Sequence, residues 1–218
     1  MRLRRGNDRM KRRGTLIGMI LALVVGGSAQ AQSFENCEKT EIAAIEASII
    51  GAHDLALQAA VNVGDTPTYT RWFGSYNRRS GDRLRRNFKS VYQSIVTEEI
   101  TGQCLNSYES SCKGGTYAFI NRNRPFFVNF CPPFFRLPTM TGVSPTSNEM
   151  ANGTQEGTII HELSHFEQTA DTDDLCYSRP DCMAMARSDP NGALRNADSF
   201  QYFAEDVMLY ADDVASSR

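Results

Sequence analysis

Two histidines four residues apart are the strongest chemical signal in the chain, in the run His161-Glu162-Leu163-Ser164-His165. On an α-helix, residues with this spacing lie on one face about one turn apart, so both imidazoles can bind the same metal ion. Glu162 lies at the edge of that face, where its carboxylate can take a proton from an attacking water. The pattern therefore predicts a metal-dependent hydrolase. The third histidine, His53, is interpreted as a structural residue of an earlier helix.

A hydrolytic zinc site needs three protein ligands and one open position. No histidine follows His165, so the third ligand is expected to be a carboxylate from further along the chain. Glu205 on a later helix is one candidate, and the segment 172–177, which contains Asp174, offers another. Two rival interpretations remain at this point. One is a structural zinc site closed by four protein ligands, which would not need Glu162, and the other is a non-catalytic secreted domain with a chance match.

The first 31 residues have the three parts of a secretory signal peptide. A head with seven Lys and Arg precedes an uncharged stretch from Leu16 to Gly27, and Ala29-Gln30-Ala31 follows. The uncharged stretch is well short of the roughly 20 residues that a membrane-spanning helix needs. We therefore expect export to a secreted or periplasmic location, with cleavage near Ala31 and a single domain over residues 32–218.

The rest of the chain is acidic and has the composition of a globular protein. Of all residues, 41% are hydrophobic and 22% are charged, which is typical of a folded domain. Residues 32–218 carry 16 basic and 24 acidic side chains, a net charge of −8. Nucleic acid would repel such a chain. We expect a monomer that binds neither nucleic acid nor, after cleavage of the signal peptide, a membrane.

Six cysteines follow the signal peptide, and an even number in an exported protein predicts three disulfides. Their spacing alone leaves all of the roughly fifteen possible pairings open. The six are Cys37, Cys104, Cys112, Cys131, Cys176 and Cys182.

Apolar periodicity predicts four helices, over residues 40–63, from about residue 80 to beyond 95, over 154–168 and over 197–210. Thr154 is the expected N-cap of the third, which carries His161 and His165. Two β-rich runs, 116–120 and 126–131, predict a hairpin whose second strand pairs with an extended substrate. Residues 132–153 are typical of a loop. The expected fold is α+β, mainly helical, with a small antiparallel or mixed sheet.

The run from Gly157 to Phe166, followed by the run from Thr172 to Tyr177, resembles the aspzincin metalloendopeptidases. That family contains deuterolysin and the peptidyl-lysine metalloendopeptidases. The resemblance extends to segments 69–74, 126–131 and 196–204, so it spans nearly the whole chain after the signal peptide. It is greatest to the lysine-specific branch, and it implies a zincin-like metalloprotease fold with an HExxH active-site helix.

The resemblance also implies the site. The second motif of the family is Gly-Thr-x-Asp-x-x-Tyr-Gly, in which the Asp is the third zinc ligand and the Tyr assists the transition state. Carried over, it implies one Zn²⁺ per chain bound by His161, His165 and Asp174, with Glu162 and Tyr177 as catalytic residues. The chain departs from the motif at its two glycines, which are replaced as follows: Asp171 and Ser178.

In the lysine-specific branch, an Asp and a Glu three residues apart line the pocket for the side chain after the scissile bond. The matching positions here are Asp198 and Gln201. The resemblance therefore implies a secreted endopeptidase that prefers Lys after the cut, with weaker discrimination because Gln201 carries no charge. A broad-specificity, deuterolysin-like endopeptidase is the alternative. For Asp198 itself, the alternative to a role in the pocket is that it only caps its helix.

The family's long and short bridges imply two of the disulfides, Cys37–Cys104 and Cys112–Cys131. Elimination leaves Cys176 with Cys182, a pair that would clamp the loop next to Asp174. The rival for Cys176 is a role as a zinc thiolate, which would leave Cys182 without a partner.

Overall fold

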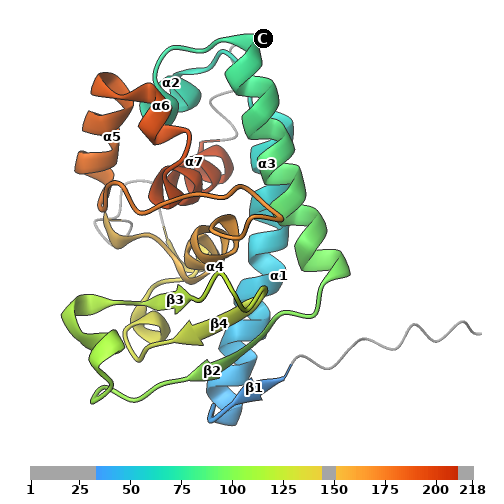
Figure 1. Cartoon of the computed structure of the whole chain (residues 1–218), viewed down its shortest axis with the longest axis vertical. Coiled ribbons are helices and arrows are strands. Elements are labelled where there is room, and N and C mark those ends of the chain that lie inside the picture. The colour runs from blue at the N-terminus through green and yellow to red at the C-terminus, as the bar shows by residue number, and fades with distance from the viewer. Residues whose placement is uncertain (1–32, 144–150, 211–218) are drawn as a thin grey trace, which may run out of the picture. The chain divides into compact units, whose positions relative to one another are not determined.

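Two long helices, α1 (Lys39–Asn62) and α3 (Arg78–Thr97), run side by side in the computed structural model (Figure 1). The structure describes residues 33–143 and 151–210, so the expected signal peptide lies outside the described residues. A capping box of Glu38 and Glu41 begins α1, and Asn77 begins α3 by accepting a hydrogen bond from the Ser80 amide. Both helices were predicted from their periodicity.

A helix that the sequence did not predict, α2 (Pro67–Phe73), connects these two. Thr66 accepts a hydrogen bond from the Tyr69 amide, and proline occupies the first helical turn, where its missing N–H needs no partner. The helix buries Trp72 and Phe73. Phe73 packs against two phenylalanines of α7 (Ala197–Leu209), with ring centroids 5.9 and 5.3 Å apart. This aromatic contact fixes α7, the helix that carries much of the site described below.

A four-stranded mixed sheet occupies the lower part of the view in Figure 1, with its strands in the order β1-β2-β4-β3. The strands are β1 (Phe34–Glu35), β2 (Thr101–Cys104), β3 (Ala118–Ile120) and β4 (Phe127–Phe130). The predicted hairpin is confirmed, because β3 and β4 pair antiparallel. The expectation that its second strand pairs with substrate is wrong. β4 lies between β2 and β3, so both of its edges are already occupied, and β3 is the strand of the hairpin that lies at an edge of the sheet.

The central helix α4 (Gln155–Ser164) packs against α1 and α7. Thr154 caps it as predicted, accepting a hydrogen bond from the Gly157 amide at 3.0 Å. The helix ends four residues before the predicted boundary, because the chain turns back and the Asp171 amide donates to the Phe166 carbonyl. Two further helices were not predicted, and three 3₁₀ turns complete the described elements. These are α5 (Arg179–Ser188), α6 (Pro190–Ala193), η1 (Ser110–Gly115), η2 (Phe134–Arg136) and η3 (Met140–Gly142).

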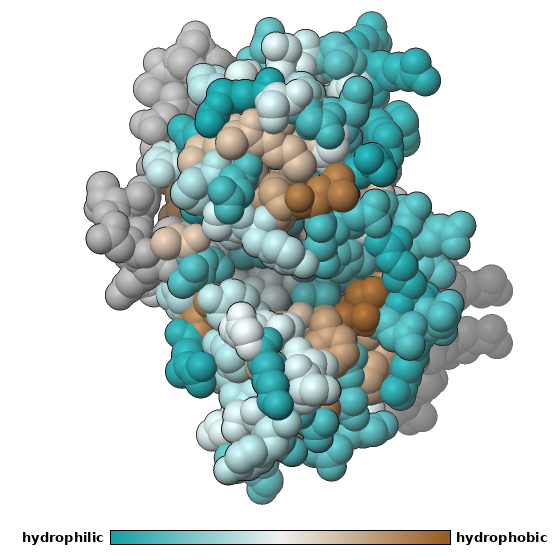
Figure 2. Space-filling view, turned by 60° about the vertical axis from the view of Figure 1, so that its left-hand side comes forward, coloured by the Kyte–Doolittle hydropathy of each residue, from teal (hydrophilic) through white to brown (hydrophobic). Residues whose placement is uncertain are grey.

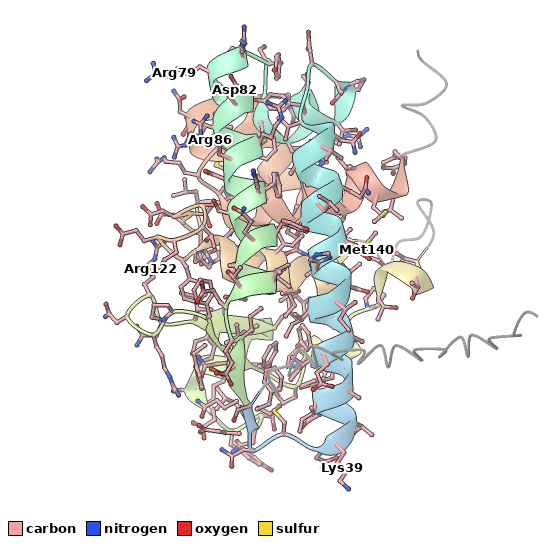
Figure 3. The ribbon with its side chains drawn as sticks, turned by 90° about the vertical axis from the view of Figure 1, so that its right-hand side faces the viewer. Lys39, Arg79, Asp82, Arg86, Arg122 and Met140 are labelled. Atoms are coloured by element: carbon pink, nitrogen blue, oxygen red, sulfur yellow. A yellow bond between two sulfur atoms is a disulfide. The ribbon has the colours of Figure 1, made fainter. Side chains whose placement is uncertain are left out.

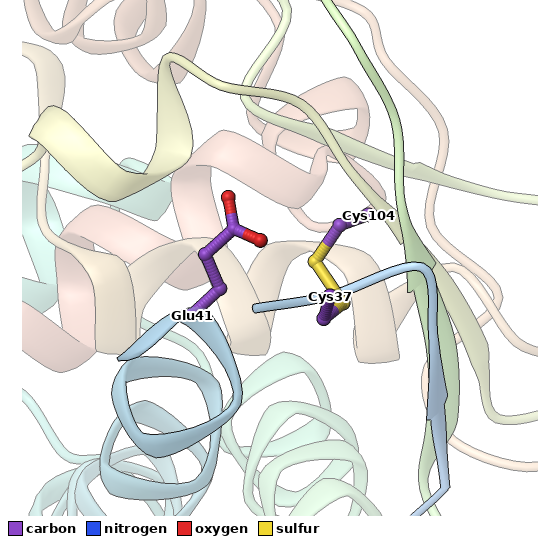
Figure 4. A group of neighbouring side chains, drawn as sticks. All are labelled: Cys37, Glu41 and Cys104. Atoms are coloured by element: carbon purple, nitrogen blue, oxygen red, sulfur yellow. A yellow bond between two sulfur atoms is a disulfide. The ribbon is translucent and has the colours of Figure 1, made fainter. Parts of the chain in front are cut away.

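All three expected disulfides are present: Cys37–Cys104, Cys112–Cys131 and Cys176–Cys182. The first joins the segment before α1 to the end of β2, with Glu41 nearby (Figure 4). This trio is not a metal site, because both sulfurs are committed to the disulfide and the Glu41 carboxylate accepts the Glu38 amide at 2.8 Å. Among the described helices, none has the length and apolar character needed to cross a bilayer.

Candidate metal centre

Three predicted ligand side chains converge at the end of α4. One ligand atom from each of His161, His165 and Asp174 lies within 4.8 Å of the others. The Asp174 Oδ1 atom is 3.2 Å from His161 Nε2 and 3.4 Å from His165 Nε2. His161 belongs to the last turn of α4 and His165 is its C-cap, so the spacing that pointed to a shared face does bring the two rings together.

Each imidazole is held from behind through its other nitrogen. His161 Nδ1 is 2.8 Å from Asp198 Oδ1, and His165 Nδ1 is 2.9 Å from the Thr172 carbonyl oxygen. These acceptors hold a proton on Nδ1, so each Nε2 faces Asp174 and is the nitrogen left to bind a metal ion in the neutral ring. Two imidazole nitrogens and one carboxylate oxygen, anchored in this way, are the donor set that a hydrolytic zinc ion takes. The residues present therefore fit zinc.

The loop that carries Asp174 is fastened to the start of α7. The buried Asn196 side chain accepts the Leu175 amide at 2.8 Å and the Cys176 amide at 2.9 Å. A short bridge between Asp173 and Asn196 adds backbone hydrogen bonds on either side. No role for Asn196 was predicted from the sequence. A signal was available, because an Asn directly before an apolar helix is typical of a cap, although here its side chain turns to the loop instead.

The two residues at the motif's glycine positions adopt backbone conformations that favour glycine. The φ angle is 50° at Asp171 and 71° at Ser178. Asp visits the left-handed region more readily than most residues do, and Ser178 is held by donation from its amide to Asp198 Oδ2 at 3.1 Å. Both positions therefore adopt a positive φ without being glycine.

The charges around the centre attract a cation. Burial lowers the pKa of His161, but hydrogen bonds with Asp174 and Asp198 outweigh it and hold this pKa well above its ordinary value. Burial raises the pKa of Asp174, and hydrogen bonds with the two histidines reverse the effect, so this pKa lies below its ordinary value. Surroundings that bind a proton this firmly also attract a divalent cation.

Glu162 and Tyr177 line the cleft above the three ligand atoms. Glu162 is buried, and this burial raises the pKa of its carboxyl group. Tyr177 is 61% exposed, and burial of its phenol together with the charge of Asp174 raises its pKa to about 12. The phenol thus keeps its proton at neutral pH and can donate a hydrogen bond. The cleft, about 810 Å³ in volume, has the edge strand β3 as one wall.

The cleft is visible in Figure 2 as a hollow across the middle of the face shown. Its side chains are mixed in character, with hydrophilic surface next to apolar surface. A concave site of this kind, with a few convergent polar groups at its floor, is typical of a substrate site.

The two predicted substrate-pocket residues are buried at the floor of this cleft. Both Asp198 oxygens have partners within the protein, His161 and the Ser178 amide. Asp198 is therefore more than a helix cap. Gln201 donates from Nε2 to Glu205 Oε1 at 3.2 Å, which turns the amide oxygen of Gln201 away from Glu205.

Glu205, the other candidate for the third ligand, does not belong to the group of converging ligand atoms. Its fully buried carboxylate accepts from the Thr154 amide at 2.8 Å and pairs with Arg179 Nη2 at 2.7 Å. Burial raises the pKa of Glu205 to about 7, although the charge of Arg179 opposes the shift. A Cβ atom at Gly157 would meet Glu205 Oε1 at 2.0 Å, so only glycine lets α4 and α7 approach this closely.

Two other expectations are settled by contacts. Cys176 is disulfide-bonded to Cys182, so the idea of a zinc thiolate at Cys176 is wrong. His53 lies in α1 with Nδ1 2.9 Å from Asp54 Oδ1 and its ring 4.6 Å from that of Tyr92, as expected of a structural residue.

Comparison with known proteins gives consistent matches. Residues 58–205 match the model of the family described as lysine-specific metallo-endopeptidase, Aspzincin_M35. A peptidyl-Lys metalloendopeptidase of Pleurotus ostreatus is 32% identical over 84% of this chain and 96% of that protein. An extracellular protease of Aeromonas hydrophila is 33% identical over 79% of this chain, which spans only 45% of that longer protein.

A solved structure, a zinc peptidase from Grifola frondosa, superposes with a TM-score of 0.66 at 26% identity. The match covers 78% of this chain and 97% of that one. The predicted zincin-like α+β fold is thus confirmed.

Proposed function

The chain belongs to the Aspzincin_M35 family of lysine-specific metallo-endopeptidases, and from this premise we propose that it is an exported zinc-dependent endopeptidase. The observation that carries the proposal is the convergence of His161 Nε2, His165 Nε2 and Asp174 Oδ1, with Glu162 beside them in an open cleft. A structural zinc site would be closed by a fourth protein ligand. The ligand group found among the described residues has three members and faces a cleft, which favours catalysis.

In this proposal His161, His165 and Asp174 hold one Zn²⁺ per chain. When bound, the ion would act as a Lewis acid and would lower the pKa of a water that it coordinates. Glu162 accepts the proton of the attacking water, because its carboxylate lines the cleft beside the ligand group and burial raises its pKa, which makes it a better proton acceptor. Glu162 then passes that proton to the leaving amine. Tyr177 donates a hydrogen bond to the oxygen of the substrate carbonyl as negative charge develops on it.

The peptide substrate lies along β3. This strand is at an edge of the sheet and forms a wall of the cleft, so an extended peptide can add to it through backbone hydrogen bonds. The side chain after the scissile bond enters the floor near Asp198 and Gln201. One carboxylate and one amide oxygen favour Lys there, with weaker discrimination than two carboxylates would give.

Export is supported by sequence and by chemistry. The basic head and apolar stretch of residues 1–31 have the pattern of a cleaved signal peptide. Three disulfides need an oxidising compartment. The catalytic domain accordingly lies within residues 32–218 and works in a secreted or periplasmic location.

The experiment that tests the activity combines metal analysis with proteolysis. We expect about one zinc per chain, loss of activity with 1,10-phenanthroline and its recovery on adding zinc. Glu162→Gln should keep the zinc but lose a factor of at least about 10²–10⁴ in turnover, the usual contribution of a general base. Glu167→Gln, an exposed change on the same segment, is the matched control and should behave like the wild type. Proteolysis that survives Glu162→Gln would refute the assignment.

Digestion of a mixed peptide library, with cleavage sites identified by mass spectrometry, tests the substrate preference. Enrichment of Lys after the cut is expected, together with some Arg. A digest without basic residues after the cut would favour the broad-specificity alternative while leaving the zinc mechanism intact.

A further inference from the structure

Arg122, in the connection between β3 and β4, reaches across to the loop that follows α4 (Figure 3). Its Nη1 atom is 2.6 Å from Asp171 Oδ1, and its Nη2 atom is 3.0 Å from Asp173 Oδ1. Between these two carboxylates, Nη2 also donates a hydrogen bond to the Thr172 carbonyl oxygen. One guanidinium thus holds three consecutive residues of the loop.

The Thr172 carbonyl is the same group that anchors a proposed zinc ligand. His165 Nδ1 is 2.9 Å from this oxygen, and Thr172 is fully buried. A carbonyl oxygen has two lone pairs, so Arg122 and His165 can share it. The position of this oxygen fixes the plane and tautomer of the His165 ring.

The ion pairs alone would do little for the protein. The side chains of Arg122, Asp171 and Asp173 are 44%, 63% and 49% exposed, and exposed ion pairs add little stability. What distinguishes Arg122 is the buried carbonyl that it contacts. Arg195 provides a contrast: it approaches Asp173 at 3.6 Å with a side chain that is 48% exposed, and the structure gives it no side-chain contact with Thr172.

Asp171 contributes one of the contacts between Arg122 and the loop in this chain. It occupies a glycine position of the family motif and has a φ of 50°. Aspartate tolerates this conformation better than most side chains, and unlike glycine it supplies a carboxylate to Arg122. The departure from the motif therefore adds an anchor for the guanidinium.

We propose that Arg122 is a positioning residue that holds the Thr172 carbonyl and, through it, keeps His165 oriented for zinc. The inference rests on the proposed function, because it assumes that His165 binds the metal. It assigns Arg122 no contact with substrate or with the reacting atoms.

The test measures zinc affinity by competition with a chromogenic chelator in the folded protein, independently of turnover. Arg122→Gln should weaken zinc binding about tenfold, the lower end of the range for residues that support a ligand. Arg195→Gln, which removes an exposed charge next to the same aspartate, should stay near the wild type. Arg122→Lys keeps the charge but not the planar fork, and should recover only part of the loss. Asp171→Asn should shift affinity in the same direction as Arg122→Gln and by less.

Each result bears on the inference in a defined way. Equal zinc affinities for Arg122→Gln and Arg195→Gln would overturn it, as would full recovery by Arg122→Lys, since charge alone would then explain the effect. Circular dichroism of each variant identifies any that is misfolded. If Arg122→Gln does not fold, the zinc affinity of the milder variant Asp171→Asn decides the inference. Failure of the wild type to bind zinc would refute the proposed function and the inference together. Normal binding by the wild type with no effect of Arg122→Gln would refute the inference alone.

Discussion

Replacement of Gln201 by glutamate would give the proposed Lys pocket the second carboxylate that the lysine-specific branch has. From the sequence alone, this change should sharpen the preference for Lys. The contact with Glu205 alters that expectation. Gln201 Nε2 lies 3.2 Å from Glu205 Oε1, so Gln201→Glu places a carboxylate oxygen where an amide donor now meets a buried carboxylate.

The repulsion between the two carboxylates can be worked from this distance. Two unit charges 3.2 Å apart interact by about 5 kcal/mol at an effective dielectric constant of 20. Such a pair shares a proton near neutral pH, as paired carboxylates do. Arg179, 2.7 Å from Glu205 Oε2, favours the charge on Glu205 and hence the proton on the introduced group. At neutral pH, Gln201→Glu should therefore select Lys little better than the wild type does.

The preference of Gln201→Glu for Lys should increase as pH rises, because the pair of carboxylates at positions 201 and 205 then loses its shared proton. A charged contact contributes about 1.5–3 kcal/mol against about 1 for a neutral one. The gain for Lys should thus reach about 2- to 30-fold once the introduced carboxylate is ionised. The assay is the ratio of kcat/KM for two peptides that differ only in Lys or norleucine after the cut, measured from pH 6 to 9.5.

An exchange of the two side chains is the matched control. In the single variant Gln201→Glu, two carboxylates face each other. Adding Glu205→Gln turns the second of them into an amide, so a carboxylate at position 201 faces an amide at position 205. In this double variant the Lys ratio should be raised already at pH 7 and should vary little with pH. A Lys ratio in Gln201→Glu alone that is high at pH 7 and independent of pH would refute the reasoning.

Three further changes have definite expected outcomes. Because burial raises the pKa of Glu205 from its ordinary value of 4.5 to about 7, its contribution to stability is complete below pH 4.5 and declines by about 3 kcal/mol by pH 7. Glu205→Gln lacks this decline, so chemical denaturation should show the variant gaining about that much relative to the wild type over this range. Tyr177→Phe should lower kcat by about 10²–10³ with zinc still bound, as loss of an oxyanion donor does. Ser178→Gly relieves a backbone strain of about 1–3 kcal/mol and loses a helix cap worth a few tenths, so the free energy of unfolding should rise; a fall would show that Ser178 is not strained.

Periodicity predicted the long helices because each presents an apolar face over several turns. Shorter elements lacked that signal. α2 has seven residues and α6 four, too few for a pattern to repeat, although the cap and proline that begin α2 were visible. β2 has glycine in its interior, where a Cβ atom would meet the Val128 carbonyl oxygen at 2.3 Å. The close packing that requires this glycine also removes the side chain by which a strand is predicted.

The parts of the candidate site that depend on the type of a side chain could be predicted from the sequence. The spacing of His161, Glu162 and His165 needed only helical geometry, whereas Asp174 needed the family resemblance, because several carboxylates follow His165. The Thr172 carbonyl gave no signal at all. A backbone acceptor is the same at every residue, so its role depends on a turn that only the folded chain reveals.

The positions along α7 explain why the metal centre and the substrate pocket cannot be treated as separate parts. Asn196 fastens the loop that carries Asp174, Asp198 holds His161, and Gln201 lines the pocket and contacts Glu205. The residues Asn196, Asp198, Gln201 and Glu205 lie on or next to the first two and a half turns of one helix. The buried aromatic core fixes the position of that helix. Loss of the Asp198 charge would therefore change the orientation of His161, a proposed zinc ligand, as well as the proposed pocket. A weaker Lys preference after that substitution is evidence about the pocket only if zinc affinity is unchanged. Gln201 hydrogen-bonds to Glu205 and to none of the three proposed metal ligands in the described structure, so substitutions at Gln201 report on the pocket more directly.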